Sequence, residues 1–304
     1  MSLKVRFLDF APDFLVNDNL FIAVLRRFFD ENCLVETDTS KRVDLEIVST
    51  FPRRRLVDLG RELIGPSPER LGEVLLRHLV LTARAEYTTS TKYRLWYTGE
   101  SIRPPLGKFD GTISFEPTNW IEKNFFLPYW VMRVNWFENS KAYELQPSPH
   151  ELLETRSPQR RPLRTVSFAT KQIAARQRVI DAVRRVIPVD EFGRKNQKPV
   201  PSKGNTSQNY FLQICTENNL YPNYVTEKLQ ESWLTGCVPI WSGLDSYEFF
   251  NEQALIDVTK LGSLEVSDVI RNLSEEELLY KQAQPLLSKE YQIHDLVAYL
   301  GTYL

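Results

Sequence analysis

The chain has 304 residues, of which 42% are hydrophobic and 25% charged, and its formal net charge is −1. This length suits two domains with separate cores, and the balanced charge removes any global electrostatic argument for binding nucleic acid or an anionic membrane. The three separated cysteines form no Cys-x-x-Cys pair, so neither a disulfide framework nor a zinc site is expected. No segment has the ~18 consecutive apolar residues of a membrane span. We expect a cytoplasmic protein, and the sequence leaves open a peripheral membrane association or an anchor removed upstream.

The first half of the chain alternates between predicted strands and helices. Strands are expected at 4–10, 43–48 and 94–98, and helices at 19–29 and 71–81. The aromatic and proline-rich run over 109–137 has no clear assignment. Strands that alternate with helices indicate an α/β class with parallel sheets.

The second half repeats this alternation after a change in composition. Between 146 and 164, prolines and arginines replace the apolar periodicity, and we interpret this segment as a linker between domains at 1–160 and 161–304. Strands are expected at 165–169, 210–215 and 238–241, helices at 174–187 and after 275, and a polar loop at 195–208. We predict two Rossmann-like domains that face each other across a hinged cleft, where ligands meet the carboxyl ends of strands. The last helix could pack back on the first domain.

A short predicted helix near the middle of the second domain has an unusual charge. Thr226 is a plausible N-cap and Gly236 a plausible end, which puts Lys228 in the first turn. A lysine there is unfavourable beside the positive end of the helix dipole unless an anion binds across it. The neighbouring Glu227 could accept two hydrogen bonds from a ribose diol. The alternative is an ordinary helix with a solvated lysine.

Two further residues combine a suitable type with a suitable position. Arg176 lies in the first turn of the helix predicted at 174–187, where it could contact a phosphate or could simply face solvent. Glu100 follows the strand at 94–98, a good position for a general base that projects into a cleft, although most acids at strand ends are only solvated.

Several common catalytic patterns are missing from the sequence. It contains no His-Glu-x-x-His or Asp-x-Asp motif, no Walker-type or Gly-x-Gly-x-x-Gly loop, and no Gly-x-Ser-x-Gly elbow. Metalloprotease, ATPase, nicotinamide-dependent and serine-hydrolase functions therefore lose their main support.

A long run of residues resembles the signature of the α1,3/α1,4-fucosyltransferases. The run consists of Glu217-Asn218, Tyr224-Val-Thr-Glu-Lys228, Gly236-Cys-Val-Pro-Ile240 and Gly243. Upstream, segments such as Tyr97-Thr-Gly-Glu100 and Leu127-Pro-Tyr-Trp130 are similar to the amino-terminal domain of that family in order and spacing. The resemblance covers roughly 94–243. Departures are Tyr210-Phe211-Leu212, where the family usually has Tyr-Lys-Phe, and Thr216, which replaces a common aromatic residue.

The resemblance implies an enzyme of the GT-B fold that uses GDP-β-L-fucose as donor and inverts the anomeric carbon. By motif match, Glu100 is the general base, Arg176 and Lys228 bind the diphosphate, and Glu227 binds the ribose. The donor pocket implied by the same match also includes Glu217, Asn218, Tyr224, Val225 and Thr226. No cofactor or metal ion is required by this match, although a divalent ion could stimulate the reaction.

The expected reaction is transfer of fucose, in α1,3 or α1,4 linkage, to an N-acetylglucosamine-containing glycan such as a bacterial surface oligosaccharide. The partners implied are therefore a GDP-sugar and an oligosaccharide acceptor, without nucleic acid. Two alternatives stay open: the same fold transferring another sugar from GDP or a related nucleotide, and a non-catalytic nucleotide- or glycan-binding protein.

Overall fold

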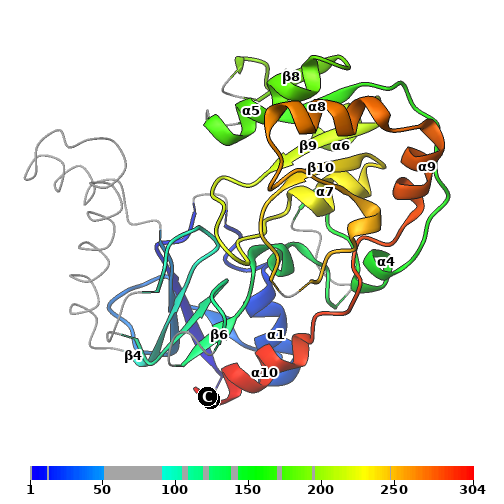
Figure 1. Ribbon diagram of the computed structural model, residues 1–304. Helices are drawn as coiled ribbons and strands as arrows, with labels where there is room; N and C mark the ends of the chain where they lie inside the picture. The colour runs from blue at the N-terminus through cyan, green and yellow to red at the C-terminus, as the bar shows by residue number, and fades with distance from the viewer. Residues whose placement is uncertain are drawn as a thin grey trace, which may run out of the picture. The chain divides into compact units, whose positions relative to one another are not determined.

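The computed structural model describes residues 2–11, 14–50, 91–104, 109–118, 123–137, 143–169, 173–193, 196–246 and 248–304 (Figure 1). Contacts divide the chain into two units. The first comprises Met1–Met132 and Gln292–Leu304, and the second comprises Arg133–Tyr291. The helix predicted at 71–81 lies outside the described residues.

The first unit is built on a parallel sheet that has six strands in the described part of the chain. Its order is β2-β1-β3-β4-β5-β6, and every pairing is parallel. The strands are β1 (Lys4–Leu8), β2 (Leu34–Val35), β3 (Val43–Val48), β4 (Thr91–Tyr97), β5 (Gly111–Ser114) and β6 (Asn124–Phe126). All but one residue of β3 and the last four residues of β4 are buried, as expected for the interior of a parallel sheet.

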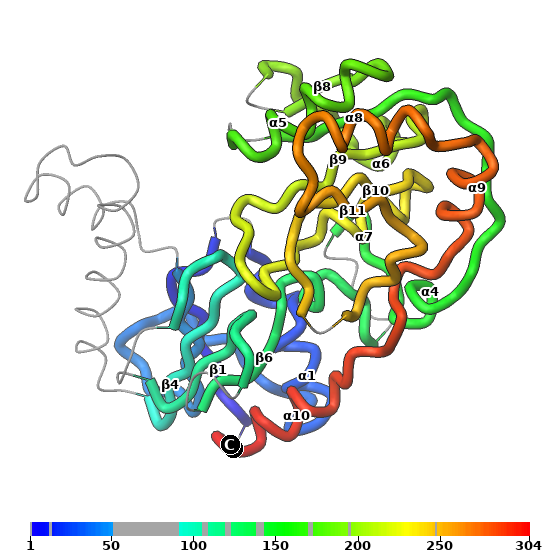
Figure 2. Tube along the Cα trace, viewed as in Figure 1, coloured from blue at the N-terminus to red at the C-terminus, as the bar shows by residue number. Residues whose placement is uncertain are grey.

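Two helices that are far apart in sequence lie side by side in the first unit. These are α1 (Leu20–Phe28), whose N-cap is Asn19, and α10 (Ile293–Gly301), which appear in blue and red in Figures 1 and 2. The hydroxyl of Tyr299 in α10 lies 2.9 Å and 2.8 Å from the carbonyl oxygens of Thr112 and Lys123. The end of the chain is therefore tied to strands β5 and β6. A 3₁₀ turn, η1 (Tyr129–Arg133), follows β6.

A row of charged side chains crosses the first sheet. Arg6, Glu46 and Arg94 occupy matching positions on β1, β3 and β4, and we call them the closed ion cluster. The Glu46 carboxylate accepts hydrogen bonds from Arg6 Nη1 at 3.1 Å and from Arg94 Nε at 2.7 Å. Arg6 Nη2 also donates to the carbonyl oxygen of Lys41. Burying this carboxylate is tolerable because two guanidinium groups satisfy it.

The second unit is built on another parallel sheet, with five strands in the described residues. Its order is β11-β10-β9-β7-β8. The strands are β7 (Thr165–Phe168), β8 (Val189–Phe192), β9 (Leu212–Thr216), β10 (Val238–Ser242) and β11 (Ile256–Asp257). The prediction of an α/β fold with two parallel sheets is therefore confirmed.

The second unit also contains six helices in its described residues. They are α4 (Pro149–Leu153), α5 (Ala174–Arg184), α6 (Lys203–Ser207), α7 (Lys228–Leu234), α8 (Ser263–Asn272) and α9 (Glu275–Ala283), with a 3₁₀ turn η3 (Glu252–Ala254). Of these, α5, α7 and α9 contact the sheet. α5 packs beside α8, whereas α7 packs against β9 and β10 (Figure 1). A core of aliphatic side chains from α5, β9, β10 and α8 fills the space between the helices and the sheet.

The boundary between the units falls earlier in the chain than the composition suggested. Contacts place it at 132/133, whereas the sequence suggested 160/161. Described residues in the stretch 133–160 pack within the second unit: Arg156 Nε donates to the carbonyl oxygen of Gln282 at 2.7 Å, and Leu287 N donates to that of Leu152 at 2.9 Å. The expected linker also contains α4, which begins with a capping box at Ser148.

Candidate donor-binding site

The second unit contains a cavity of about 420 Å³ at the carboxyl edge of its sheet. Ala169, Gly193 and Asn218 line it, and each lies directly beyond or close to the end of β7, β8 or β9. Charged side chains from the helices complete the lining: Arg176, Lys203, Glu227, Lys228 and Glu231. The carboxyl edge of a parallel sheet is the usual ligand position in this architecture.

The turn that carries Lys228 is held by a buried carboxylate. Glu217 follows β9 and is 1% exposed. Its side chain accepts hydrogen bonds from the backbone N of Thr226 at 2.9 Å and from Lys228 Nζ at 2.8 Å, and the Thr226 hydroxyl lies 2.9 Å from Oε2. Glu217 is not among the cavity-lining residues. It therefore positions the lysine from behind the pocket.

This network changes the predicted cap of the short helix. α7 begins at Lys228, its N-cap is Glu227, and neither Thr226 nor Glu227 makes a side-chain capping bond. The Thr226 hydroxyl contacts Glu217, which is why it does not cap the helix. The predicted end of the helix at Gly236 is confirmed: its φ is 81°, and a Cβ there would lie 2.4 Å from Arg161 Nη2.

Two cations face the cavity next to Glu217, and with it they form what we call the pocket ion cluster: Arg176, Glu217 and Lys228. Burial lowers the pKa of Lys228, but Glu217 and Glu227 raise it more, so that the net pKa is raised. Burial lowers the pKa of the Arg176 guanidinium, and Glu217 partly offsets this. Arg176 Nη2 donates to the Thr216 carbonyl oxygen at 3.2 Å and to Asn218 Oδ1 at 3.1 Å. Both cations are thus held in fixed positions at the pocket.

Glu227 lies between cations on both sides. Burial raises the pKa of its carboxyl group. The positive charges of Lys228, Lys203 and Arg133 together lower it by more than this rise, so that the net pKa is lowered. Glu227 lines the cavity, so its carboxylate can accept hydrogen bonds from a ligand there.

The other predicted donor-pocket residues fall into two groups. Asn218 lines the cavity with Arg176, Glu227 and Lys228. Tyr224, Val225 and Thr226 are 3%, 1% and 4% exposed and are not cavity-lining residues. Four of the predicted donor-pocket residues therefore line the cavity. The other four, Glu217, Tyr224, Val225 and Thr226, are buried and do not line it.

Sequence reasoning missed Lys203 and Glu231, which also line the cavity. Lys203 is the first residue of α6, directly after the N-cap Ser202, so its charge is as unusual for a helix start as that of Lys228. Glu231 lies one turn after Glu227, and its backbone N donates to the Glu227 carbonyl oxygen at 2.9 Å. A polar loop was expected at 195–208, so the start of α6 at Lys203, and with it the unusual charge, was not predicted.

Glu100 belongs to the first unit, three residues beyond the end of β4. Its backbone N donates to Thr98 Oγ1 at 3.0 Å, and that hydroxyl lies 2.9 Å from the Glu100 carbonyl oxygen. The preceding Gly99 allows the close approach of an aromatic ring, because a Cβ there would lie 2.5 Å from Tyr129 Cδ2. Glu100 is thus half-buried at the carboxyl edge of the first sheet, on a tightly fixed backbone.

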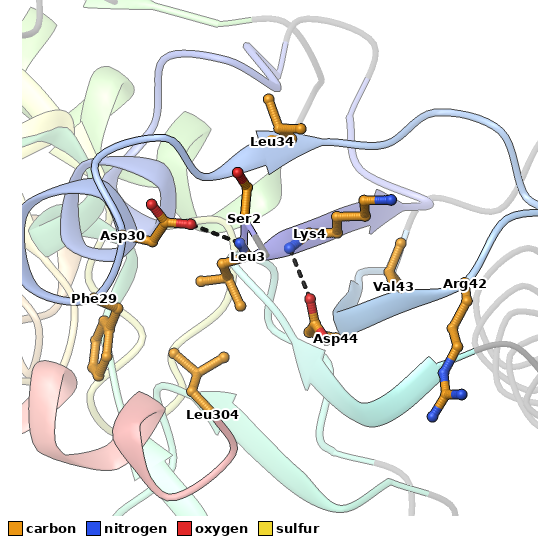
Figure 3. Close-up of a pocket in the computed structure, with 10 residues that line it drawn as sticks. All are labelled: Ser2, Leu3, Lys4, Phe29, Asp30, Leu34, Arg42, Val43, Asp44 and Leu304. Carbon is orange, nitrogen blue, oxygen red and sulfur yellow. Dashed lines mark hydrogen bonds between the residues drawn. The ribbon is translucent and has the colours of Figure 1, made fainter.

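The first unit has a cavity of its own at the opposite, amino edge of its sheet (Figure 3). Its two carboxylates are already engaged: Asp30 accepts from Leu3 N at 2.6 Å and Asp44 from Lys4 N at 2.9 Å. None of the predicted site residues lines it. This cavity is therefore not the candidate site.

Within the described residues, no three His, Cys, Asp or Glu side chains are grouped in a way that could hold a metal ion. In the same part of the chain, no helix has the length and apolarity needed to span a bilayer. The cysteines at 33, 215 and 237 are free and buried.

Comparison with known proteins finds similarity to fucosyltransferases. Residues 159–293 match the profile described as glycosyltransferase family 10 (fucosyltransferase) C-term. An alpha-(1,3)-fucosyltransferase FucT from Helicobacter pylori is 21% identical over 220 residues, covering 63% of this chain and 46% of the relative. This chain thus spans about half the length of that relative.

Solved structures show the same fold. A crystal structure of an alpha1,3-fucosyltransferase superposes with a TM-score of 0.70 at 16% identity, covering 99% of this chain and 90% of the other. A structure of an alpha1,3-fucosyltransferase with GDP-fucose gives a TM-score of 0.68 at 17% identity with the same coverage, and one with GDP gives 0.70 at 18%. The predicted GT-B fold is therefore confirmed.

Proposed function

We propose that the protein is an inverting fucosyltransferase that uses GDP-β-L-fucose, because residues 159–293 match the profile of glycosyltransferase family 10 (fucosyltransferase) C-term. The observation that carries this proposal is the convergence of Arg176, Glu227 and Lys228 on one cavity at the carboxyl edge of the second sheet. Two cations and one carboxylate match the charges of a nucleoside diphosphate and the hydrogen-bond donors of its ribose.

The proposed donor-binding mode uses these side chains directly. Arg176 and Lys228 bind the diphosphate, and the negative charge that develops on GDP as it leaves is stabilised by the same two groups. Glu227 accepts hydrogen bonds from the ribose hydroxyls. Glu217 holds Lys228 in place, since its carboxylate is bonded to both Lys228 and Thr226.

Glu100 is the proposed general base. It takes the proton of the acceptor hydroxyl while that oxygen attacks the anomeric carbon of fucose. The bond from the anomeric carbon to the β-phosphate oxygen breaks, and GDP leaves with the electron pair. Attack from the face opposite to GDP converts the β-linked donor into an α-linked product.

The proposed acceptor is a glycan that contains N-acetylglucosamine, with fucose added in α1,3 or α1,4 linkage. The support for the α1,3 linkage comes from the names of the similar proteins, which are described as alpha-(1,3)-fucosyltransferases.

A transfer assay tests donor and acceptor together. The protein is incubated with GDP-fucose, GDP-mannose, UDP-galactose or UDP-N-acetylglucosamine on a glycan array, and products are detected by mass spectrometry. We expect turnover with GDP-fucose on N-acetylglucosamine-containing glycans. Turnover with another donor instead would indicate a different glycosyltransferase, and GDP binding without transfer to any glycan would favour a non-catalytic protein.

The role of Glu100 is tested by Glu100→Gln, which keeps size and removes the base. We expect transfer to fall by about 10²–10⁴-fold while GDP affinity is unchanged, because the residue acts on the acceptor proton. The matched control is Glu36→Gln, a carboxylate of the first unit in an ion pair with Lys41 that lines neither cavity. Normal transfer by Glu100→Gln would refute the base assignment.

A further inference from the structure

A second polar group lies in the donor cavity beside the proposed ribose ligand. Lys203 Nζ lies 2.8 Å from Glu231 Oε2, and Arg133 Nη2 lies 3.5 Å from Glu231 Oε1. The Glu231 side chain is 10% exposed, whereas that of Lys203 is 44% exposed. Both residues line the cavity, and neither has a role in the function proposed above. The pair therefore offers an acceptor and a donor to a ligand.

The charged residues of α7 that line the cavity lie at two levels of the helix. Lys228 is paired with Glu217, and Glu227 is under the electrostatic influence of both Lys228 and Lys203. Glu231 follows one helical turn later, about 6 Å along the axis. The cavity therefore presents Glu227 and Lys228 at the start of α7 and, one turn farther on, a carboxylate paired with an ammonium group. A nucleoside diphosphate likewise carries its base beyond the ribose, away from the diphosphate.

The surroundings of the pair suit a flat heterocycle. Phe168, Pro199, Val200 and Ile214 also line the cavity and add apolar surface near the polar groups. Aromatic and apolar side chains contact the faces of a base, while a few polar groups read its edge.

We propose that Glu231 and Lys203 recognise the base of the donor nucleotide and select guanine. This inference rests on the proposed function, because it assigns a base to the donor that the function requires. The guanine edge presents two adjacent donors, N1–H and the 2-amino group, and the O6 acceptor. A carboxylate can accept from both donors, and an ammonium group beside it can donate to O6.

The same pair disfavours other bases. Adenine presents its N1 acceptor where guanine presents N1–H, so that its lone pair would face the Glu231 carboxylate. Uracil and cytosine place a carbonyl oxygen at the position of the 2-amino group. Specificity thus comes from repulsion of the wrong bases as well as from attraction of guanine.

Lys203 has a second effect in this arrangement. Burial and the nearby Glu227 raise the pKa of Glu231 by more than Lys203 and Arg133 lower it, so that the net pKa is raised, but by less than it would be without Lys203. The ammonium group therefore helps to keep Glu231 ionised and able to accept two hydrogen bonds. A role for Lys203 as a third phosphate ligand is the competing explanation.

The test measures Kd values of GDP, IDP, XDP and guanosine by calorimetry for the wild type, Glu231→Gln and Lys203→Ala. IDP lacks the 2-amino group, and XDP has an oxygen in its place. We expect the wild type to bind GDP at least about tenfold more tightly than IDP, because a hydrogen bond to a charged group is lost. Glu231→Gln should lower GDP affinity by at least about tenfold and shift preference toward XDP, since an amide can donate to that oxygen.

The variant Lys203→Ala shows whether Lys203 contacts the base or the phosphates of the nucleotide. We expect it to weaken GDP and guanosine binding by similar factors, because the base is common to both ligands. A loss confined to GDP would show that Lys203 contacts phosphate and would overturn its assignment. The control is Arg271→Ala, which removes an exposed cation from α8 and should leave every Kd unchanged.

Different results would refute the proposed function and the assignment of Glu231 and Lys203 to the base. Suppose that the wild type binds GDP and transfers fucose. The base assignment is then wrong, and the proposed function stands, if the wild type has similar Kd values for GDP and IDP. The same conclusion follows if Glu231→Gln leaves the ratios of the Kd values for GDP, IDP and XDP unchanged. If the wild type binds no GDP, both are wrong. Because the GDP-to-IDP ratio is measured on the wild type, the inference stays falsifiable even if a variant does not fold.

Discussion

The closed ion cluster of the first unit and the pocket ion cluster of the second each place two cations around one buried carboxylate, yet their surroundings differ. In the closed ion cluster the side chains of Arg6, Glu46 and Arg94 are 1%, 0% and 10% exposed, and none of them lines either cavity described above. In the pocket ion cluster Arg176 and Lys228 line the cavity of the second unit, and the Lys228 side chain is 20% exposed.

The position in the sheet accounts for this difference. Glu46 lies within β3, between strands on both sides, so its partners come from matching positions on β1 and β4 and enclose it. Glu217 lies just beyond the end of β9, where no neighbouring strand continues, and its partner lysine can turn toward the cavity. Similar charges are thus enclosed by the sheet in one unit and line a cavity in the other.

The largest effect is expected for Glu46→Ala. Removing the carboxylate leaves two buried guanidinium groups without their counter-charge, which should cost about 3–5 kcal/mol of unfolding free energy. Urea unfolding followed by circular dichroism measures this loss, and calorimetry on the folded fraction should give an unchanged GDP affinity.

A triple variant separates charge from packing in the same cluster. Arg6→Met, Glu46→Leu and Arg94→Met together replace the charges by apolar groups, and we expect them to recover most of the stability. If Glu46→Ala costs less than ~1 kcal/mol, or if it weakens GDP binding, the distinction between the two clusters is wrong.

The next largest effect is expected on ligand affinity. Arg176→Ala and Lys228→Ala should each weaken GDP binding by ~1.5–3 kcal/mol, since each removes a charge-assisted hydrogen bond. Calorimetric titration with GDP measures this loss. The double variant Lys228→Met/Glu217→Gln serves as a control, because it removes the lysine without leaving Glu217 as an uncompensated buried charge. Normal GDP affinity in both single variants would refute the assignment of the diphosphate site.

The sequence predicted these two regions unequally. The buried strands were found because the alternation over 43–48 and the largely apolar run over 238–241 are clear local signals, and both segments are strands. The short strands β5 and β6 were not assigned, since their four and three residues are too few for a periodic pattern. The capping box at Ser148 was a local signal for α4 that the proline-rich composition hid.

In the candidate site too, the residues predicted were those that have a local signal in the sequence. Arg176, Glu227 and Lys228 were predicted from position and motif, and all three line the cavity. The pairing of Lys203 with Glu231 joins residues 28 positions apart on two helices. No local periodicity encodes that pairing, because it depends on how α6 packs against α7.

A smaller effect is expected from ionic strength. Salt screens exposed charges much more than buried ones, as the Debye length falls from about 10 Å at 0.1 M to about 3 Å at 1 M. GDP affinity should therefore fall several-fold over this range, whereas the stability difference between the wild type and Glu46→Ala should stay within ~0.5 kcal/mol. Titrations and unfolding curves in KCl measure both quantities. Equal salt dependence of the two would mean that the closed ion cluster is accessible to solvent.

The smallest effect is expected for an ion pair outside both clusters. Arg271 Nη1 lies 2.5 Å from Asp268 Oδ1 on α8, but their side chains are 57% and 63% exposed. Water competes for both groups, and holding two long side chains together costs entropy, so Arg271→Ala should change stability by less than ~0.5 kcal/mol and leave GDP affinity unchanged. Urea unfolding and GDP titration check both. A cost similar to that of Glu46→Ala would mean that close contact alone, rather than burial among strands, decides what an ion pair contributes in this protein.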